Sequence, residues 1–161
     1  MVLLLLLMNL LLFLSMQKEN ILNYIKTKVQ EKIENLQHLI SEARNSNNDT
    51  KSSMGDKYET GREMLQQVIN QYQSQLKEVL AQKEVLDHLT TDVCTKVQNG
   101  ALVKTERALF YISVSLGEIQ VEDSKVFAVS KEAPLVQAMF GKSISETFNF
   151  NGQVQTILSI W

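Results

Sequence analysis

Apolar residues recur with a helical period over two long stretches in the first half of the chain. The first stretch, from Gln17 to about Arg44, contains no Gly or Pro. Its periodic apolar positions are Leu22, Ile25, Val29, Ile33, Leu36, Leu39, Ile40 and Ala43. A heptad stripe of this kind predicts an amphipathic helix that packs along a second helix. Lys32 interrupts the stripe, but its stem can lie along the seam while its amine reaches water.

A second stretch, from about Asp56 to Leu89, repeats the heptad pattern. Its periodic positions are Tyr58, Leu65, Ile69, Tyr72, Leu76, Val79 and Leu86. The residues between the two stretches, 45–55, are polar apart from Met54 and include several turn formers. Two heptad stretches joined by a short polar loop predict an antiparallel coiled-coil hairpin, with its tip near residues 45–57. A homodimeric coiled coil is the alternative that heptads alone leave open.

After Asp92 the pattern changes to short segments rich in β-branched and aromatic residues, which predict strands. Four of these segments read "GALVKTE", "ALFYISVS", "GEIQVED" and "KVFAVS". The segment "APLVQAMFGK" predicts a short helix with Pro134 in its first turn and Gly141 at its C-terminal end. A closing β-hairpin is expected to turn at Asn151-Gly152. Its expected apolar face comprises Phe148, Phe150, Val154, Ile157 and Ile160.

The fold class that follows is α+β. A long antiparallel helical hairpin over residues 16–92 precedes a small, partly open antiparallel sheet of five or six strands with one short helix, over residues 96–161. The sequence contains no Gly-rich phosphate loop, nucleophile elbow or metal-ligand cluster. We therefore expect the C-terminal module to bind a partner rather than to catalyse a reaction.

Residues 1–15 form an apolar leader ahead of the first heptad stretch. The apolar run from Val2 to Leu14 is shorter than the ~20 residues of a bilayer-spanning helix. It also lacks the basic region and the cleavage site of a secretory signal. We favour a start of synthesis at Met16, with the leader as a spurious upstream extension, and an atypical signal or anchor is the alternative. No stable membrane association is expected.

Composition and charge narrow the classes of function. The chain has 161 residues, a formal net charge of −2 and a sequence pI near 5.7, which argues against a general nucleic-acid coat. Its one cysteine, Cys94, excludes an internal disulfide and any cysteine-based zinc cluster. These features fit a cytoplasmic protein, which we expect to be a monomer without a cofactor or metal of its own.

Two stretches resemble the Gre-type transcription elongation factors, in which a long N-terminal hairpin precedes a small FKBP-like domain. In "KYETGREM", the spacing of Tyr58, Arg62 and Glu63 is similar to the Tyr-x-x-x-Arg-Glu that begins the second helix in that family. In "VSKEAPLVQAMFGKSISETFNFNG", the order of Ser, Pro, apolar helix and Gly-Lys is similar to the family's C-terminal segment. The likeness covers most of residues 17–160.

The resemblance implies an accessory factor that binds RNA polymerase and meets nucleic acid only within the elongation complex. It implies that the C-terminal domain docks at the secondary channel, through a platform that we place at Pro134, Phe140, Gly141 and Lys142. The hairpin tip would then reach the active centre and rescue backtracked complexes by stimulating transcript cleavage. Acidic tip residues would help to hold a Mg²⁺ ion shared with the polymerase, because two-metal hydrolysis needs carboxylates around the metal.

The tip departs from the family pattern. The family places an Asp and a Glu at positions that hold Lys51 and Met54 in this chain. The acids present are Asp49, Asp56 and Glu59, which we take as candidate metal-assisting residues. Candidate tip or partner contacts are Lys51, Lys57, Tyr58, Arg62 and Glu63.

Simpler roles are open for the same tip residues. Asp56 and Glu59, or Ser53 and Asp56, have the spacing of a helix-capping box, and either acid suits the positive end of a helix dipole. Arg62 and Glu63 can form exposed ion pairs within their helix.

Three other functions can be compared with the sequence. A channel regulator of the same shape that does not assist cleavage is favoured by Lys51 and Met54. A 3-oxoacyl-(acyl-carrier-protein) synthase needs a cysteine nucleophile with histidine or asparagine partners on a much larger fold, which this sequence does not support. A peptidyl-prolyl isomerase would rest on analogy with the FKBP-like fold alone.

Overall fold

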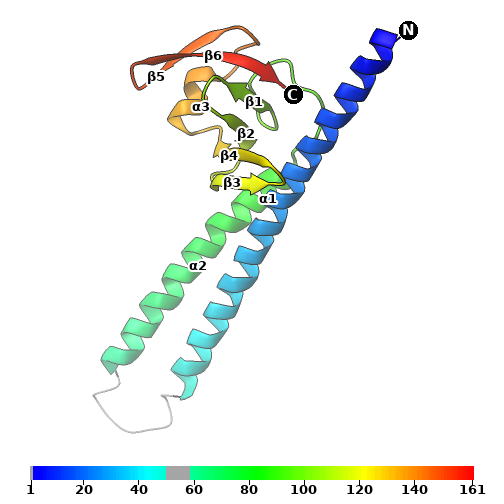
Figure 1. The fold of residues 1–161 in the computed structure, drawn as a ribbon. Helices are drawn as coiled ribbons and strands as arrows, with labels where there is room; N and C mark the ends of the chain where they lie inside the picture. The colour runs from blue at the N-terminus through cyan, green and yellow to red at the C-terminus, as the bar shows by residue number, and fades with distance from the viewer. Residues whose placement is uncertain (1, 50–58) are drawn as a thin grey trace. The chain divides into compact units, whose positions relative to one another are not determined.

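The computed structural model describes the backbone of residues 2–49 and 59–161, and the side chains of residues 2, 5, 9–16 and 47–49 lie outside the description. Internal contacts divide the chain into two compact units. Unit 1 comprises Met1–Lys26 and Val85–Trp161, and unit 2 comprises Thr27–Glu84. The two long helices, α1 (Val2–Asp49) and α2 (Glu59–Asp87), each contribute residues to both units (Figure 1).

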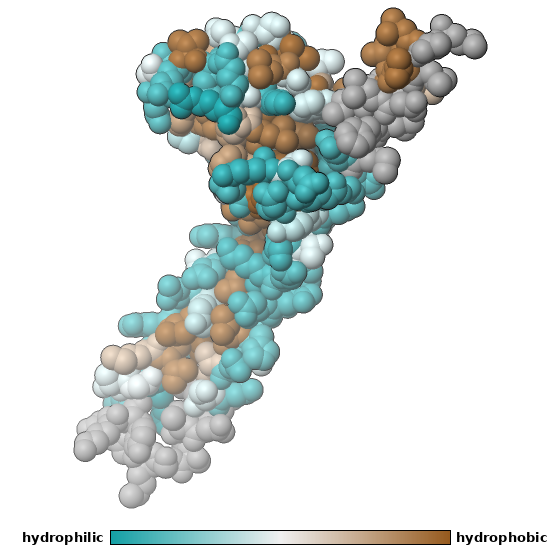
Figure 2. All heavy atoms as spheres, in the orientation of Figure 1, coloured by the Kyte–Doolittle hydropathy of each residue, from teal (hydrophilic) through white to brown (hydrophobic). Residues whose placement is uncertain are grey.

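Unit 2 is the predicted helical hairpin. Residues 37–45 of α1 and residues 73–76 of α2 line a common groove, which places the two helices side by side. The buried seam of this unit consists of Val29, Ile33, Leu36, Ile40, Ile69 and Val79. On the surface of the two helices, hydrophobic areas lie among hydrophilic ones (Figure 2). The seam therefore joins two segments of one chain, and the intrachain hairpin is confirmed.

The helices do not begin and end where the sequence predicted. The helix expected from Gln17 to about Arg44 runs from Val2 to Asp49. No Gly or Pro precedes Gly55, so no residue of that kind ends α1 earlier. The leader continues the same helix, and Leu3, Leu4, Leu6, Leu7 and Met8 are exposed. Within the described residues, no helix carries an apolar stretch long enough to cross a membrane.

Unit 1 contains a six-stranded sheet and a short helix, as the predicted α+β fold requires. The elements are β1 (Leu102–Thr105), β2 (Leu109–Ser113), β3 (Gly117–Val121), β4 (Ser124–Ser130), α3 (Pro134–Met139), β5 (Thr147–Phe150) and β6 (Gln153–Ile160). The strand order is β3-β4-β2-β1-β6-β5. The pairing of β2 with β4 is parallel and the other pairings in this sheet are antiparallel, so the sheet is mixed where a wholly antiparallel one was predicted.

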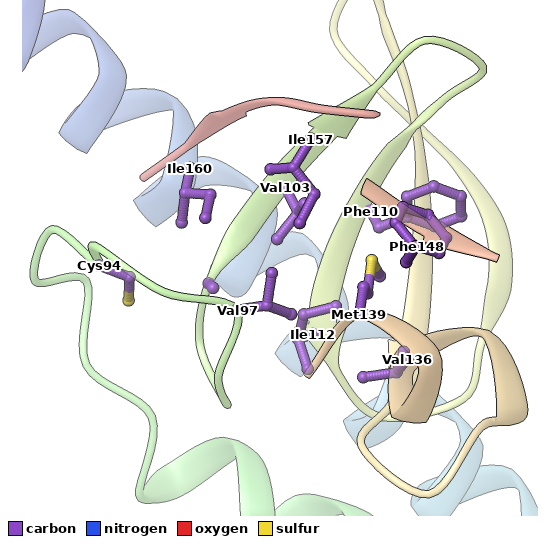
Figure 3. Packing of buried hydrophobic residues seen from close by; sticks show 11 residues of the cluster. Cys94, Val97, Val103, Phe110, Ile112, Val136, Met139, Phe148, Ile157 and Ile160 are labelled. Atoms are coloured by element: carbon purple, nitrogen blue, oxygen red, sulfur yellow. The ribbon is translucent and has the colours of Figure 1, made fainter. Parts of the chain in front are cut away.

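One face of the sheet packs against α3. Val103, Phe110, Ile112, Phe148 and Ile157 from the strands join Val136 and Met139 from the helix in one buried cluster (Figure 3). Pro134 stands at the first helical position, where a backbone N–H would have no partner within the helix. Gly141 follows the end of the helix and adopts φ +77. The predicted short helix is thereby confirmed.

The opposite face of the sheet is buried as well. Leu102, Tyr111, Val126 and Ala128 are 0–1% exposed and alternate with the residues that face α3. Ile21 of α1 lines a small pocket together with Leu109 and Val121, and Asn20 of α1 donates a hydrogen bond to Glu122. Residues 17–21 of α1 therefore cover part of this face.

The closing hairpin turns at Asn151-Gly152, as predicted. Both residues have positive φ, 52 and 76, and Phe150 pairs with Gln153 across the turn. The predicted apolar face was wrong at Val154, which is 65% exposed. Because a two-residue turn puts Phe148 opposite Gln155, the inward positions of β6 are odd-numbered as far as Ile157. A register shift opposite Lys104/Thr105 then lets Ile160 also face inward.

Candidate functional site

The candidate tip acids lie around the connection between α1 and α2. Asp49 is the last residue of α1, and its side chain is outside the description. Glu59 is the first residue of α2 and is exposed there, where a carboxylate suits the positive end of the helix dipole. Asp56, Lys51, Lys57 and Tyr58 lie outside the described residues. Whether the three acids come together therefore stays a prediction, as do both capping boxes.

Arg62 and Glu63 occupy the first turns of α2. Glu63 is exposed and Arg62 is half-buried, so one side chain faces solvent and the other lies partly against the helix surface. This difference agrees with the heptad phase, because Arg62 lies seven residues before Ile69, a buried seam residue. The partner-contact roles assigned to Arg62 and Glu63 stay predictions.

Three of the four predicted platform residues, Phe140, Gly141 and Lys142, lie between α3 and β5, whereas Pro134 begins α3. Backbone bonds tie this turn to the preceding loop: Gly141 N donates to Val97 O at 2.8 Å, and Val97 N donates to Lys142 O at 2.9 Å. Ser143 forms an isolated bridge with Lys96, and its N donates to the Glu146 carboxylate at 2.6 Å. The turn is therefore anchored on both sides by hydrogen bonds.

Two apolar side chains stand out from this anchored turn. Phe140 is 46% exposed and Ile144 is 51% exposed. Gly141, between them, has open space where a Cβ would be. The platform prediction named Phe140 and missed Ile144. The position of Ile144, three residues after Gly141 at the end of the helix, was a usable signal. Exposed apolar residues on a rigid turn are suited to contact another protein.

A second feature that the sequence reasoning missed is a buried cluster around Lys18. This side chain is 1% exposed, and its amine lies 3.6 Å from Cys94 Sγ. Burial lowers the pKa of the Lys18 ammonium, against the opposing influence of Cys94 and Asp92. The available signal was spacing, because Lys18 lies four residues before Leu22 and seven before Ile25, on the apolar stripe.

No group of three or more metal-ligating side chains is found in residues 2–49 and 59–161, apart from the undescribed side chains. Tyr111 is fully buried on the α1-facing side of the sheet, and its hydroxyl has no hydrogen-bond partner among the described residues. Burial raises the pKa of this hydroxyl, with a smaller contribution from Cys94.

No protein-family model matches the chain, and no curated protein matches it. Among solved structures, the chain is similar to the GreA factor homolog 1 (Gfh1) protein of Thermus thermophilus, at 15% identity and a TM-score of 0.36, over 84% of this chain and 94% of that chain. It is similar to Gfh1 of Thermus aquaticus at 14% identity and a TM-score of 0.33, over 83% and 92% of the two chains. A third similar structure is that of the transcription factor Gfh1, at 14% identity and a TM-score of 0.34, over 84% of this chain and 92% of that chain. At such identities and TM-scores, the likeness does not identify the function of this chain.

Proposed function

We propose that this protein is a Gre-type transcription elongation factor that binds RNA polymerase and inserts its helical hairpin into the secondary channel. The observation that supports the proposal best is the pairing, in one chain, of an intrachain coiled-coil hairpin with a six-stranded sheet module. The Tyr58-x-x-x-Arg62-Glu63 spacing at the start of the second helix adds sequence support. Both features belong to the family that the sequence resembles.

Phe140 and Ile144 would make the docking contact with the polymerase. Both side chains are about half exposed on a turn whose backbone is held by Val97. Burying such residues against a partner removes apolar surface from water without the entropy cost of ordering a mobile loop. The anchored turn thus favours binding at this place over binding at the exposed residues of β6.

The tip would assist cleavage of a backtracked transcript. Asp49 ends α1 and Glu59 begins α2, so these acids bracket the connection that also contains Asp56. Carboxylate oxygens are suitable ligands for Mg²⁺, which would supply the activated water within the polymerase. The protein itself would position these acids, and its hairpin would keep other molecules out of the channel.

A non-cleaving regulator of the same shape is the second candidate. It is favoured by Lys51 and Met54, which stand where the family has acids. A lysine near the acids weakens the local negative field, and that field is what attracts a divalent cation. This version binds the polymerase and changes pausing without releasing RNA.

RNA release from purified backtracked complexes at physiological Mg²⁺ tests the two versions. We expect the parent protein to release short 3′ RNA and the Asp49/Asp56/Glu59→Ala variant to bind without releasing it. Glu78→Ala, which removes an exposed acid from the middle of α2, is the matched control and should behave like the parent. Binding without release by the parent would support the regulator.

Docking is tested separately by the affinity of each variant for RNA polymerase. The Phe140→Ala/Ile144→Ala double variant should bind at least ~10-fold more weakly, because apolar anchors dominate such contacts. Val154→Ala removes a side chain that is 65% exposed elsewhere on the sheet and should leave the affinity unchanged. If the parent fails to bind the polymerase, the proposed function is wrong.

A further inference from the structure

The buried Lys18 holds its amine against the chain's single cysteine. Its Nζ lies 2.6 Å from the carbonyl oxygen of Asp92, 3.1 Å from the carbonyl oxygen of Trp161 and 3.6 Å from Cys94 Sγ. Lys18 is 1% exposed and Cys94 is 7% exposed. All four residues belong to unit 1, so the cluster lies within one compact unit.

Burial of the Lys18 amine increases its neutral, nucleophilic fraction, although Cys94 and Asp92 oppose this effect. A neutral lysine amine has two N–H groups and one lone pair, and the carbonyls of Asp92 and Trp161 can accept both hydrogens. Burial lowers the pKa of this group, which increases the neutral fraction relative to an exposed lysine. The sulfur lies in the third direction, where Nζ donates to Sγ at 3.6 Å. When the amine loses the proton on that side, its lone pair takes that direction and faces the sulfur.

The Cys94 thiol is held in place but has no thiol partner in the chain. Gln98 Nε2 donates to Sγ at 3.5 Å, and Sγ itself lies 3.6 Å from the carbonyl oxygen of Asp92. Cys94 is the one cysteine of the sequence, so no intrachain disulfide can form. Cys94 keeps 7% of its surface exposed, and the adjacent Val93 is 57% exposed, so a small oxidant would have to reach the thiol through this narrow opening. Cys94 comes from the loop that precedes β1 and lies at the edge of the buried cluster that packs against α3 (Figure 3).

We propose that Lys18 and Cys94 form a reversible sulfenamide cross-link when the protein meets a peroxide. In the first step the sulfur attacks the peroxide: the O–O bond breaks, an S–O bond forms and one water leaves. In the second step the lone pair of the Lys18 amine attacks the sulfenic sulfur, an S–N bond forms, and the hydroxyl leaves as water with an amine proton. The sum is thiol plus amine plus hydrogen peroxide giving sulfenamide plus two waters, with sulfur oxidised by two electrons. A thiol reductant reverses the bond and restores both side chains.

The cross-link would join α1 to the loop that precedes β1, across 76 positions of sequence. A covalent tie of that span limits the unfolded chain and stabilises unit 1, as a disulfide of the same loop length does. It would also protect Cys94 from irreversible oxidation to the sulfinic acid, because the sulfur is already bonded to nitrogen. This inference is independent of the proposed role at RNA polymerase.

The test is tryptic peptide mapping of the full-length protein by mass spectrometry, before and after treatment with hydrogen peroxide. We expect a peptide pair that joins Lys18 to Cys94, lighter by about 2 Da than the two free peptides together. The bond should block cleavage after Lys18, and treatment with dithiothreitol should restore that cleavage. Cys94→Ser, the nearest replacement for the thiol, should give no cross-linked pair.

Two lysine variants separate the amine's chemistry from its packing. Lys18→Met keeps the length of the side chain without the amine, so Cys94 should gain about 16 or 32 Da as sulfenic or sulfinic acid. Lys32→Met, at an exposed lysine of the same helix, should keep the cross-link. If Lys18→Met does not fold, the map of the parent protein still decides. A parent protein whose Cys94 becomes sulfinic acid or an intermolecular disulfide while Lys18 stays cleavable would overturn the proposal, and so would an unoxidised Cys94.

Discussion

The hairpin of unit 2 and the sheet of unit 1 bury apolar residues in different ways. In the hairpin, the buried residues lie on one stripe of each helix, along the seam between α1 and α2. In the sheet, strand β2 is buried on both sides, with Phe110 and Ile112 toward α3 and Tyr111 toward α1. A residue in the sheet core therefore has neighbours in more directions, and removing its side chain leaves a cavity that is harder to close.

The same difference explains why the sequence predicts the hairpin more completely than the sheet. The hairpin follows from local periodicity, since a seam residue at one position predicts the next one three or four residues on. The sheet depends on which strands meet, and no local pattern places β4 parallel to β2. The misassigned Val154 has the same origin, because its side depends on the turn and on the register shift in β6.

Parts of the candidate site could be predicted and parts could not. The platform was placed from the family resemblance, and the 46% exposure of Phe140 at the end of α3 is a finding of the structure. The contact of Lys18 with Cys94 joins residues 76 positions apart, so no spacing rule finds it. The tip acids Asp49, Asp56 and Glu59 were predicted from a loop whose residues 50–58 lie outside the description, so their arrangement stays a prediction.

The largest expected effect tests the sheet core. Ile157→Ala removes a side chain that is 0% exposed on β6 and should lower the free energy of unfolding by about 3 kcal/mol. Urea unfolding followed by the fluorescence of Trp161, the single tryptophan, measures unit 1 directly. Val154→Ala on the same strand should stay within about 0.5 kcal/mol of the parent. Equal losses from both variants would contradict the assigned faces of β6.

A smaller loss is expected in the hairpin seam. Ile33→Ala, at a residue 4% exposed in α1, should cost about 2 kcal/mol, because the seam has one packing partner and can partly close the gap. Hydrogen exchange of the amides in residues 27–84 reports this change separately from unit 1. Leu80→Ala, at a residue 46% exposed in α2, is the control and should leave the exchange unchanged. If Ile33→Ala lowered the free energy of unfolding more than Ile157→Ala does, the expected order of the seam and the sheet core would be wrong.

The smallest expected effect has the opposite sign. Tyr111→Phe removes a buried hydroxyl that no described polar group contacts, and it should raise the free energy of unfolding by about 1 kcal/mol at neutral pH. A loss of stability at neutral pH would show that the hydroxyl makes a favourable contact.

The same variant gives a pH test. Tyrosine in the unfolded chain loses its proton near its ordinary pKa of 10.0, whereas burial raises the pKa of Tyr111 in the folded chain. The unfolded state therefore binds fewer protons above this pH, and the parent loses stability as pH rises past it. Chemical unfolding at a series of alkaline pH values should show the advantage of Tyr111→Phe growing above pH 10.0. An advantage that stays constant with pH would contradict the raised pKa.

We propose that the chain binds RNA polymerase through the secondary channel, and this proposal can be tested directly. The most direct measurement is the equilibrium binding of the full-length protein, fluorescently labelled at an exposed residue, to purified core RNA polymerase. We expect saturable binding that an established Gre-type factor displaces in competition. Absence of binding, or binding that such a competitor leaves unchanged, would contradict it.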